Sequence, residues 1–502
     1  MNSLLTIRPE LLTLTTEQYQ ALSPFFWVFG GTVLAIIASV FRFMSPKWPV
    51  FFVAIATAAA GIYFSARLLH GAPVSLFNGM MVSDSYSNFF NILFMASAAL
   101  TALSSLKYLD SEKLQHPEYY VLLLFSALGM MLMSSATDLI VVFIALEIMS
   151  LTVYILVGFR RADRKSNEAA MKYFILGSAA SAILLYGTAL LYGATGTTAI
   201  QGVIHAVQAT PAIQNPIFTL GAWLVILGFL FKVASVPFHM WMPDVYEGAP
   251  TPVTGFMTTG LKAAAFATFV RVFISMGYGH GLSTVIQTHI HNILYVSAVL
   301  TMVIGNIVAL TQTNLKRMLA YSSIAHSGYL LVGLIAGSQS EQGYAPVVLY
   351  LASYAIMNLG AFVVLTVLAK KNDTGLNLHD IAGLSSKHPW IAFSLTIFMF
   401  SMAGIPPTAG FAAKYLLFYS AIQAHETPLV VISVLCSAIS VYYYLRVLVY
   451  MYMRDPAEAG APRNKISVWS AAALAAMVVL TLQIGVLPAK MMAAAKRAVT
   501  SL

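Results

Sequence analysis

The chain has 502 residues, of which 59% are hydrophobic and 9% are charged, and its formal net charge is +9. Soluble domains carry about 25% charged residues, so this composition predicts an integral membrane protein. A single cysteine, Cys436, excludes an internal disulfide framework and the usual multi-cysteine zinc and iron–sulfur sites. The basic residues lie mainly at the ends of apolar segments, which is typical of membrane proteins and argues against nucleic-acid binding.

Apolar segments long enough to cross a bilayer recur from Phe25 to the C-terminus, and they predict an all-α polytopic fold with about fourteen transmembrane helices. The N-terminal stretch lacks a basic region and a cleavage site, so we expect it to be an uncleaved tail. The expected spans are residues 24–43, 48–68, 86–106, 118–135, 138–159, 169–193, 216–241, 252–276, 289–311, 315–337, 344–369, 389–422, 427–452 and 466–488.

The loops between these segments differ in charge. Lysine and arginine gather on one alternating set, of which the stretch RRADRK at residues 160–165 is the richest, whereas the other set has almost none. Because basic loops stay in the cytoplasm, this pattern predicts that both termini lie on the opposite, periplasmic side.

Two of the expected spans carry proline in their interior, at Pro237 and at Pro406 and Pro407. Proline removes a backbone donor and clashes with the preceding turn, so we expect broken helices at the seventh and twelfth spans. These spans are five apart, which suggests two consecutive units of five helices each. Because five is an odd number, the second unit must insert in the opposite direction to the first. The sequence thus predicts two inverted repeats, at residues 116–280 and 281–455, between an N-terminal part, 1–115, and a C-terminal helix, 456–502.

Four ionisable residues lie well inside the expected spans: Glu147, Lys232, Lys262 and Lys414. Each costs about 2.5 to 3.5 kcal/mol to insert at the centre of a helix, which favours a functional role. The alternative is that the lysines reach the membrane interface and that Glu147 forms a structural bridge with one of them.

Lysines buried beside a movable carboxylate are suited to carry protons. Burial favours the neutral amine and a nearby carboxylate favours the ammonium, so a Glu147–Lys232 pair that opens and closes would switch Lys232. Lys232 would then pass its proton to Lys262 through bound water. His326 lies in the middle of another span and is a candidate relay between Lys262 and Lys414, although a lone histidine can equally be a packed, hydrogen-bonded one.

Two acidic sites lie near the ends of spans. Glu168 and Lys172 are four residues apart on one helical face, and they are either an ordinary exposed pair or the mouth of a proton inlet. Asp244 and Glu247 follow the first broken helix, and we interpret them as acids that cap and turn the chain.

Common nucleotide and metalloprotease motifs are missing from the sequence. There is no GxxxxGKS-type phosphate loop, no GxGxxG after a strand and no HExxH. A single-chain ATP-driven pump or dinucleotide-binding enzyme is therefore not expected, and we predict no cofactor-binding and no metal-binding residues.

Several long blocks of the sequence resemble the antiporter-like subunits of respiratory complex I, the proton-pumping NADH:quinone oxidoreductase. The resemblance extends from about the fourth span to the thirteenth, and within the family it is greatest to the N-type branch. The blocks are FIALEIMSLTVYILVGF, EAAMKYFILGSAASAILLYG, FKVASVPFHMWMPDVYEGAPTPVTGF, NLKRMLAYSSIAHSGYLLVG and GIPPTAGFAAKYLLF.

The resemblance implies roles for matching residues. Glu147 and Lys232 would be the pair on the fifth and seventh helices, Lys262 the central relay, and Lys414 the terminal lysine on the broken twelfth helix. His326 lies in the matching tenth-helix block, and Glu168 and Lys172 match polar positions associated with the inlet.

The resemblance also implies the setting. FMN, iron–sulfur clusters and quinone would be bound by other subunits, and the neighbours in the inner (plasma) membrane would be M-type and K-type subunits. An alternative is a component of a multisubunit Na⁺/H⁺ antiporter, which shares the same helices. A third is a membrane scaffold whose charges only hold partner chains.

Overall fold

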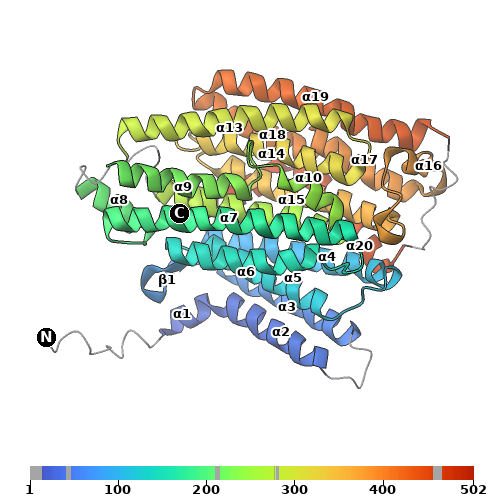
Figure 1. Ribbon diagram of the computed structural model, residues 1–502, viewed down its shortest axis with the longest axis horizontal. Helices are drawn as coiled ribbons and strands as arrows, with labels where there is room; N and C mark the ends of the chain where they lie inside the picture. Colours follow the sequence, from blue (N-terminus) through green and yellow to red (C-terminus); the bar gives the residue numbers. More distant parts are fainter. Residues whose placement is uncertain (1–13, 41–46, 210–214, 276–277, 279–281, 456–465) are drawn as a thin grey trace.

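The computed structural model describes residues 14–40, 47–209, 215–275, 278, 282–455 and 466–502. This part of the chain is almost entirely helical, and its long helices lie side by side along one common direction (Figure 1). Twelve of the helices described there are long and apolar enough to cross a membrane, and two apolar helices, Pro216–Lys232 and Pro389–Ala403, are shorter. The polytopic helical membrane fold expected from the sequence is confirmed.

The first helices that the structure describes lie along one edge of the molecule (Figure 1). An antiparallel hairpin, in which Val74 pairs with Ser83, links the third helix to the fourth, which lies further inside. These elements are α1 (Thr16–Ala21), α2 (Ser23–Val40), α3 (Lys47–Leu68), β1 (Val74–Leu76), η2 (Phe77–Gly79), β2 (Met81–Ser83) and α4 (Ser85–Ser111).

The next group of helices contains the first break. It ends in a continuous helical segment that passes through one π-helical turn, η4. The elements are α5 (Glu118–Ser135), α6 (Leu139–Val157), α7 (Arg164–Thr195), α8 (Ile200–Ala209), α9 (Pro216–Lys232), α10 (Trp241–Gly248), α11 (Thr251–Phe256), η4 (Met257–Leu261) and α12 (Lys262–Ser275).

The last group contains the second break and ends with two C-terminal helices. The elements are α13 (Thr284–Thr311), α14 (Leu315–Ala336), α15 (Ala345–Leu368), η5 (Lys371–Asp373), η6 (Leu378–Ile381), α16 (Leu384–Lys387), α17 (Pro389–Ala403), α18 (Ala409–Gln423), α19 (Thr427–Met453), α20 (Val468–Val486) and α21 (Pro488–Val499).

Three segments form the centre of the molecule: α11–α12, α14 and α15, whose side chains are almost all buried. The outer helices α2, α7, α13 and α19 instead expose large apolar side chains, such as Trp27, Tyr186 and Tyr442. In a water-soluble protein such a surface would be unfavourable, but in a bilayer it faces hydrocarbon. The polar side chains on the central helices are therefore shielded from lipid by a ring of apolar helices.

The first expected break is confirmed. Helix α9 ends at Lys232, the segment around Pro237 is not helical, and α10 begins at Trp241. Side-chain donors bind carbonyl oxygens at this break: Ser327 Oγ donates to the Val233 carbonyl at 2.6 Å, and Trp241 Nε1 donates to the Phe231 carbonyl at 3.3 Å. The interruption is thus tolerated inside the protein without unpaired backbone groups at these points.

The second expected break is also confirmed. Helix α17 ends at Ala403, and α18 begins at Ala409 after the Pro406–Pro407 pair. Gly404 turns the chain with a φ of +85°, a conformation that costs other residues about 1–2 kcal/mol. A Cβ atom at Gly404 would also lie 3.1 Å from Cδ of Lys414, so glycine leaves room for that lysine to return to the break.

Candidate functional site

The first buried lysine, Lys232, lies at the C-terminal end of α9, beside the carboxylate-bearing helix α6. Its Nζ donates a hydrogen bond to Ser150 Oγ at 2.9 Å and lies 5.9 Å from the ring centroid of Tyr154. Glu147 is on the same helix, one turn before Ser150, and its buried Oε1 atom has no hydrogen-bond partner. The expected Glu147–Lys232 ion pair is therefore open in this structure, with a serine holding the lysine.

Lys262 is the first residue of α12, directly after the π-helical turn. Its Nζ donates to both the carbonyl and the hydroxyl of Ser323 on α14, and it lies 5.2 Å from the ring centroid of Tyr354. A π-turn moves one residue out of the regular helical register, and such turns recur at functional sites. Here the turn precedes a lysine that is 3% exposed.

A small cavity connects Lys232 and Lys262. Its volume is about 10 Å³, and side chains from α6, α7, α9, α10, η4 and α12 line it. A cavity of about this size holds one water molecule when polar partners are present, and the side chains of both lysines line this one. The structure therefore brings the two lysines together around a space suited to a bridging water.

His326 occupies the middle of α14 and is 1% exposed. Its Nδ1 lies 2.6 Å from the Tyr350 hydroxyl and its Nε2 lies 3.2 Å from the Tyr444 hydroxyl. Both interpretations of this histidine remain compatible with the geometry, since it is well packed and hydrogen-bonded and also contacts groups able to exchange protons.

Lys414 lies on α18 and folds back to the second break. Its Nζ donates to the carbonyl oxygens of Met402 and Ala403, at 2.9 and 3.3 Å, and to Ser437 Oγ at 2.9 Å. These carbonyls are the free acceptors at the C-terminus of α17, where the helix dipole favours a cation. The broken helix thus provides uncharged hydrogen-bond acceptors for the lysine.

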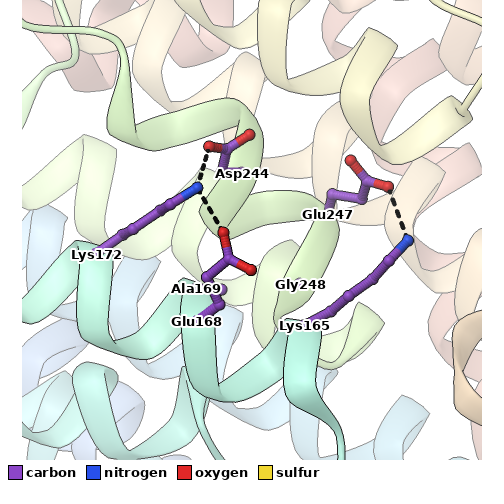
Figure 2. Close-up of a pocket in the computed structure, with 7 residues that line it drawn as sticks. All are labelled: Lys165, Glu168, Ala169, Lys172, Asp244, Glu247 and Gly248. Atoms are coloured by element: carbon purple, nitrogen blue, oxygen red, sulfur yellow. Dashed lines mark hydrogen bonds and ion pairs between the residues drawn. The ribbon is translucent and has the colours of Figure 1, made fainter.

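Near the N-terminus of α7, charged side chains surround a cavity of about 250 Å³ (Figure 2). Lys172 Nζ lies 2.8 Å from both Glu168 and Asp244, as the dashed lines in Figure 2 show. Arg317 of α14 contacts Asp244 at 2.9 Å and Glu247 at 3.1 Å. The Glu168–Lys172 pair is therefore part of a larger network around an open cavity.

The interpretation of Asp244 and Glu247 as capping acids was wrong. Both lie within α10, which has Met240 at its N-cap and no side-chain cap bond. Their carboxylates instead bind Lys172, Arg317 and Lys165, which come from the neighbouring helices α7 and α14. The spacing of three residues on a helix was the signal that they share a face.

A second charged cluster, which sequence reasoning missed, is buried around Asp373, the last residue of η5. The carboxylate lies 3.1 Å from Lys316 Nζ and 3.4 Å from Arg160 Nη2, and it accepts hydrogen bonds from the Tyr108 hydroxyl and the Thr251 backbone N–H. Burial alone would raise the pKa of Asp373, but the charges of Lys316 and Arg160 outweigh burial and lower it. Asp373 is therefore an ionised anchor for the helix that carries Lys262.

The same two cations fix the peptide that joins α10 to α11. Arg160 Nη2 donates to the Gly248 carbonyl at 3.1 Å, and Lys316 Nζ donates to the Ala249 carbonyl at 2.6 Å. The Asp373 cluster thus connects the end of α10 with the start of the helix leading to Lys262. Its members are scattered in the sequence, so no spacing pattern could have revealed it.

The next question is whether side chains gather into a metal site. Among the described residues, no group of three or more His, Cys, Asp or Glu side chains is arranged to hold a metal ion. Serine hydroxyls, in contrast, accept hydrogen bonds from Lys232, Lys262 and Lys414. The site is a line of cations and hydroxyls, which suits it to exchange protons between neighbouring groups.

The chain is similar to known membrane proteins over most of its length. Residues 136–440 match the family model described as NADH:quinone oxidoreductase/Mrp antiporter, TM. NADH-quinone oxidoreductase subunit N of Trichlorobacter lovleyi is 45% identical over 439 residues, which are 88% of this chain and 88% of the relative.

Solved structures show the same fold. Respiratory complex I from Thermus thermophilus contains a chain that matches with a TM-score of 0.79 and 33% identity, over 94% of this chain and 98% of that one. A chain of the Mrp complex from a Dietzia species matches with a TM-score of 0.83 over 97% of this chain and 98% of its own, but at 20% identity it shows the fold alone. The chain therefore belongs to the NADH:quinone oxidoreductase/Mrp antiporter membrane family and, within it, to the group of NADH-quinone oxidoreductase N subunits.

Proposed function

We propose that this chain translocates protons across the membrane as a subunit of the membrane arm of NADH:quinone oxidoreductase, through Glu147, Lys232, Lys262, His326 and Lys414. The observation that carries this proposal is the kind of partner that Lys232, Lys262 and Lys414 have. In the part of the chain that the structure describes, all three lysines donate to neutral oxygens and none has a carboxylate within ion-pair distance. A lysine that served only structure would be expected to have a buried counter-charge.

Neutral partners make the release of a proton feasible. A hydroxyl or carbonyl oxygen accepts a hydrogen bond from an ammonium, but it lacks the full negative charge that would hold the proton in place. When Lys232 transfers its proton towards Lys262, the lone pair left on its nitrogen can accept a hydrogen bond from the Ser150 hydroxyl. Glu147, with its free oxygen one turn away, is placed to stabilise the protonated form when the pair closes.

The charged cavity at α7 and α10 is our candidate for proton entry. Glu168, Lys172 and Asp244 line it, and Asp244 and Glu247 belong to α10, which directly follows the first break. Tyr246 of the same short helix borders the inner cavity between Lys232 and Lys262. One element therefore contacts both the mouth and the inner cavity, which supports a path between them.

The energy for translocation comes from quinone reduction in other subunits, since this chain is one subunit of the enzyme. FMN, the iron–sulfur clusters and quinone are assigned to those subunits, and M-type and K-type subunits to the flanking positions in the inner membrane. The same proposal includes two inverted repeats, at residues 116–280 and 281–455, with flanking parts at 1–115 and 456–502. It also includes about fourteen membrane spans and a periplasmic location of both termini. The presence of a buried lysine at each break, Lys232 at the first and Lys414 at the second, supports the proposal of two structural repeats.

Replacing Lys262 with methionine tests the proposal. Methionine is similar in length and cannot carry a proton, so the assembled complex should lose NADH oxidation and proton uptake together. Both are measured in inside-out membrane vesicles, after assembly has been checked on a native gel. Lys490→Met, at an exposed position on α21, is the matched control. Unchanged proton uptake by the assembled Lys262→Met complex would refute the proposal, and uptake that required sodium would favour the Na⁺/H⁺ antiporter alternative.

A further inference from the structure

A buried network of polar side chains lies between His326 and Lys414, and the line of charged residues does not account for it. Its members are Tyr443 and Tyr444 on α19, Asn306 on α13 and Tyr329 on α14, which are the helices packed around that space. None of the four side chains is more than 1% exposed. Four buried polar groups of this kind need hydrogen-bond partners, and they find them in one another.

One part of the network starts at His326. The Tyr444 hydroxyl lies 3.2 Å from His326 Nε2 and also contacts Ser322 Oγ. The ring of Tyr443 packs against that of Tyr444 at a centroid distance of 4.5 Å. A series of adjacent hydroxyl-bearing side chains thus leads from the histidine to Tyr443.

The other part of the network starts at Lys414. Its Nζ donates to Ser437 Oγ at 2.9 Å and lies 5.2 Å from the ring centroid of Tyr329. A second, shorter series of hydroxyl-bearing side chains, Ser437 and Tyr329, therefore begins at the lysine.

Asn306 is the link between the two series. Its Nδ2 donates to the Met302 carbonyl at 2.8 Å and to the Tyr329 hydroxyl at 3.2 Å, and its Oδ1 accepts from the Tyr443 hydroxyl at 3.0 Å. A backbone carbonyl can only accept, so the contact with Met302 fixes which end of the amide is nitrogen. Tyr443 must therefore donate to Asn306, and Tyr329 must accept from it.

The chemistry of an amide differs from that of the groups on either side. A hydroxyl in a chain accepts a proton on its oxygen while it releases its own proton to the next oxygen, so one proton moves and each hydroxyl is restored. An amide donates and accepts hydrogen bonds, but near neutral pH it neither takes up nor releases a proton. A proton that arrives at Tyr443 can therefore go no further through Asn306.

We propose that Asn306 is a positioning residue that separates the proton-conducting hydroxyls around His326 from those around Lys414. Protons then pass between the two groups only when the surrounding helices rearrange or admit water. The inference rests on the proposed function, because it assigns a barrier within the same relay. Such a barrier would keep the two parts of the relay from equilibrating between turnovers.

Replacing the amide with a protonatable side chain tests this inference. Asn306→Asp should join the two series, so that the assembled complex oxidises NADH at an undiminished rate but translocates fewer protons per NADH. Adding Tyr443→Phe removes the hydroxyl that delivers the proton and should restore the ratio. Asn306→Ser is a second, uncharged variant for the case in which the aspartate variant does not assemble. Because a serine hydroxyl can pass a proton, the same loss of protons per NADH is expected.

The matched control is Tyr442→Phe, which removes a hydroxyl from the adjacent residue of α19, whose side chain is 62% exposed. It should leave the proton ratio of Asn306→Asp unchanged. The inference is overturned if assembled Asn306→Asp and Asn306→Ser complexes keep the wild-type ratio, or if the loss is independent of Tyr443. Lys262→Met, measured in the same vesicles, distinguishes the two proposals. If it stops proton uptake while the Asn306 variants keep the wild-type ratio, only the inference about Asn306 fails. If Lys262→Met has no effect, the proposed function itself fails.

Discussion

The ammonium of Lys232 donates its hydrogen bond to Ser150, at 2.9 Å, and not to the nearby carboxylate of Glu147. Ser150 and Glu147 are three residues apart on α6, so a modest movement of the lysine side chain exchanges one partner for the other. This arrangement gives Lys232 one neutral partner and one charged partner on the same helical face.

Ser150→Ala should shift Lys232 towards Glu147. Without the hydroxyl, the ammonium loses one hydrogen bond, and NADH-driven proton uptake should fall about fivefold, as expected from the net value of such a bond. The rate is measured in membrane vesicles and normalised to assembled complex. Ser126→Ala is the control, because the Ser126 hydroxyl is buried without a partner and its removal should cost little. Equal rates for the two variants would contradict the assigned role of Ser150.

Gly404→Ala should destabilise the second break. The backbone φ of +85° costs alanine about 1–2 kcal/mol, and the added Cβ would press on Lys414. We expect a lower thermal unfolding temperature of the detergent-solubilised complex. Gly30→Ala is the matched control, since Gly30 lies within helix α2 and a Cβ there meets nothing within 4 Å. A Gly404→Ala complex as stable as the Gly30→Ala complex would show that the break tolerates other backbone geometries.

Asp244→Asn should slow the entry of protons while leaving the fold intact. The residue contacts Lys172 and Arg317 in a partly exposed network, and such pairs contribute only about 0–1 kcal/mol to stability. The initial rate of proton uptake should therefore fall at an unchanged amount of assembled complex. Lys165→Met, which removes an exposed cation 3.6 Å from Glu247 in the same cavity, should have a smaller effect. The reverse order would argue against entry beside Asp244.

Asp373 should make stability depend on pH. Burial would raise its pKa, but Lys316 and Arg160 outweigh burial, so the carboxyl group titrates below its unfolded value of about 3.9. A lowered pKa contributes stability that is complete above the unfolded pKa and is lost as the pH falls through the folded pKa.

The comparison of wild type with Asp373→Asn measures this contribution. Removing the charge leaves Lys316 without its buried carboxylate and Arg160 with Asp163 alone, at a cost of about 3 kcal/mol at neutral pH. The difference in thermal stability between the two proteins should stay constant from about pH 7 to about pH 5 and shrink below about pH 4. A difference that does not change over this range would mean that Asp373 is not the ionised anchor of the cluster.

The breaks and the buried lysines could be predicted from the sequence because each rests on a local rule. Pro237 and Pro406 cannot continue a helix, and Lys232 and Lys262 are conspicuous within apolar segments. The Ser150, Ser323 and Ser437 hydroxyls that hold the lysines could not be predicted, since serine is common in these helices and the contacts join distant segments.

The error at Asp244 and Glu247 has a physical cause. The prolines and glycine around them suggested a loop, whereas residues Trp241–Gly248 form a short helix that packs between α7 and α14. Packing of this helix against α7 and α14 thus outweighed the local signal. The Asp373 cluster was out of reach for the same reason, because its members come from separate loops and helix ends.

The most direct test of the account is the Lys232→Arg variant of the complex. Arginine keeps the positive charge but does not release a proton at physiological pH, so it separates a proton carrier from a charge that only holds the structure together. The measurement is NADH oxidation together with proton uptake in inside-out vesicles, normalised to the complex assembled on a native gel. The account predicts normal assembly with a large loss of both activities. An assembled Lys232→Arg complex that oxidises NADH and takes up protons at the wild-type rate would contradict it.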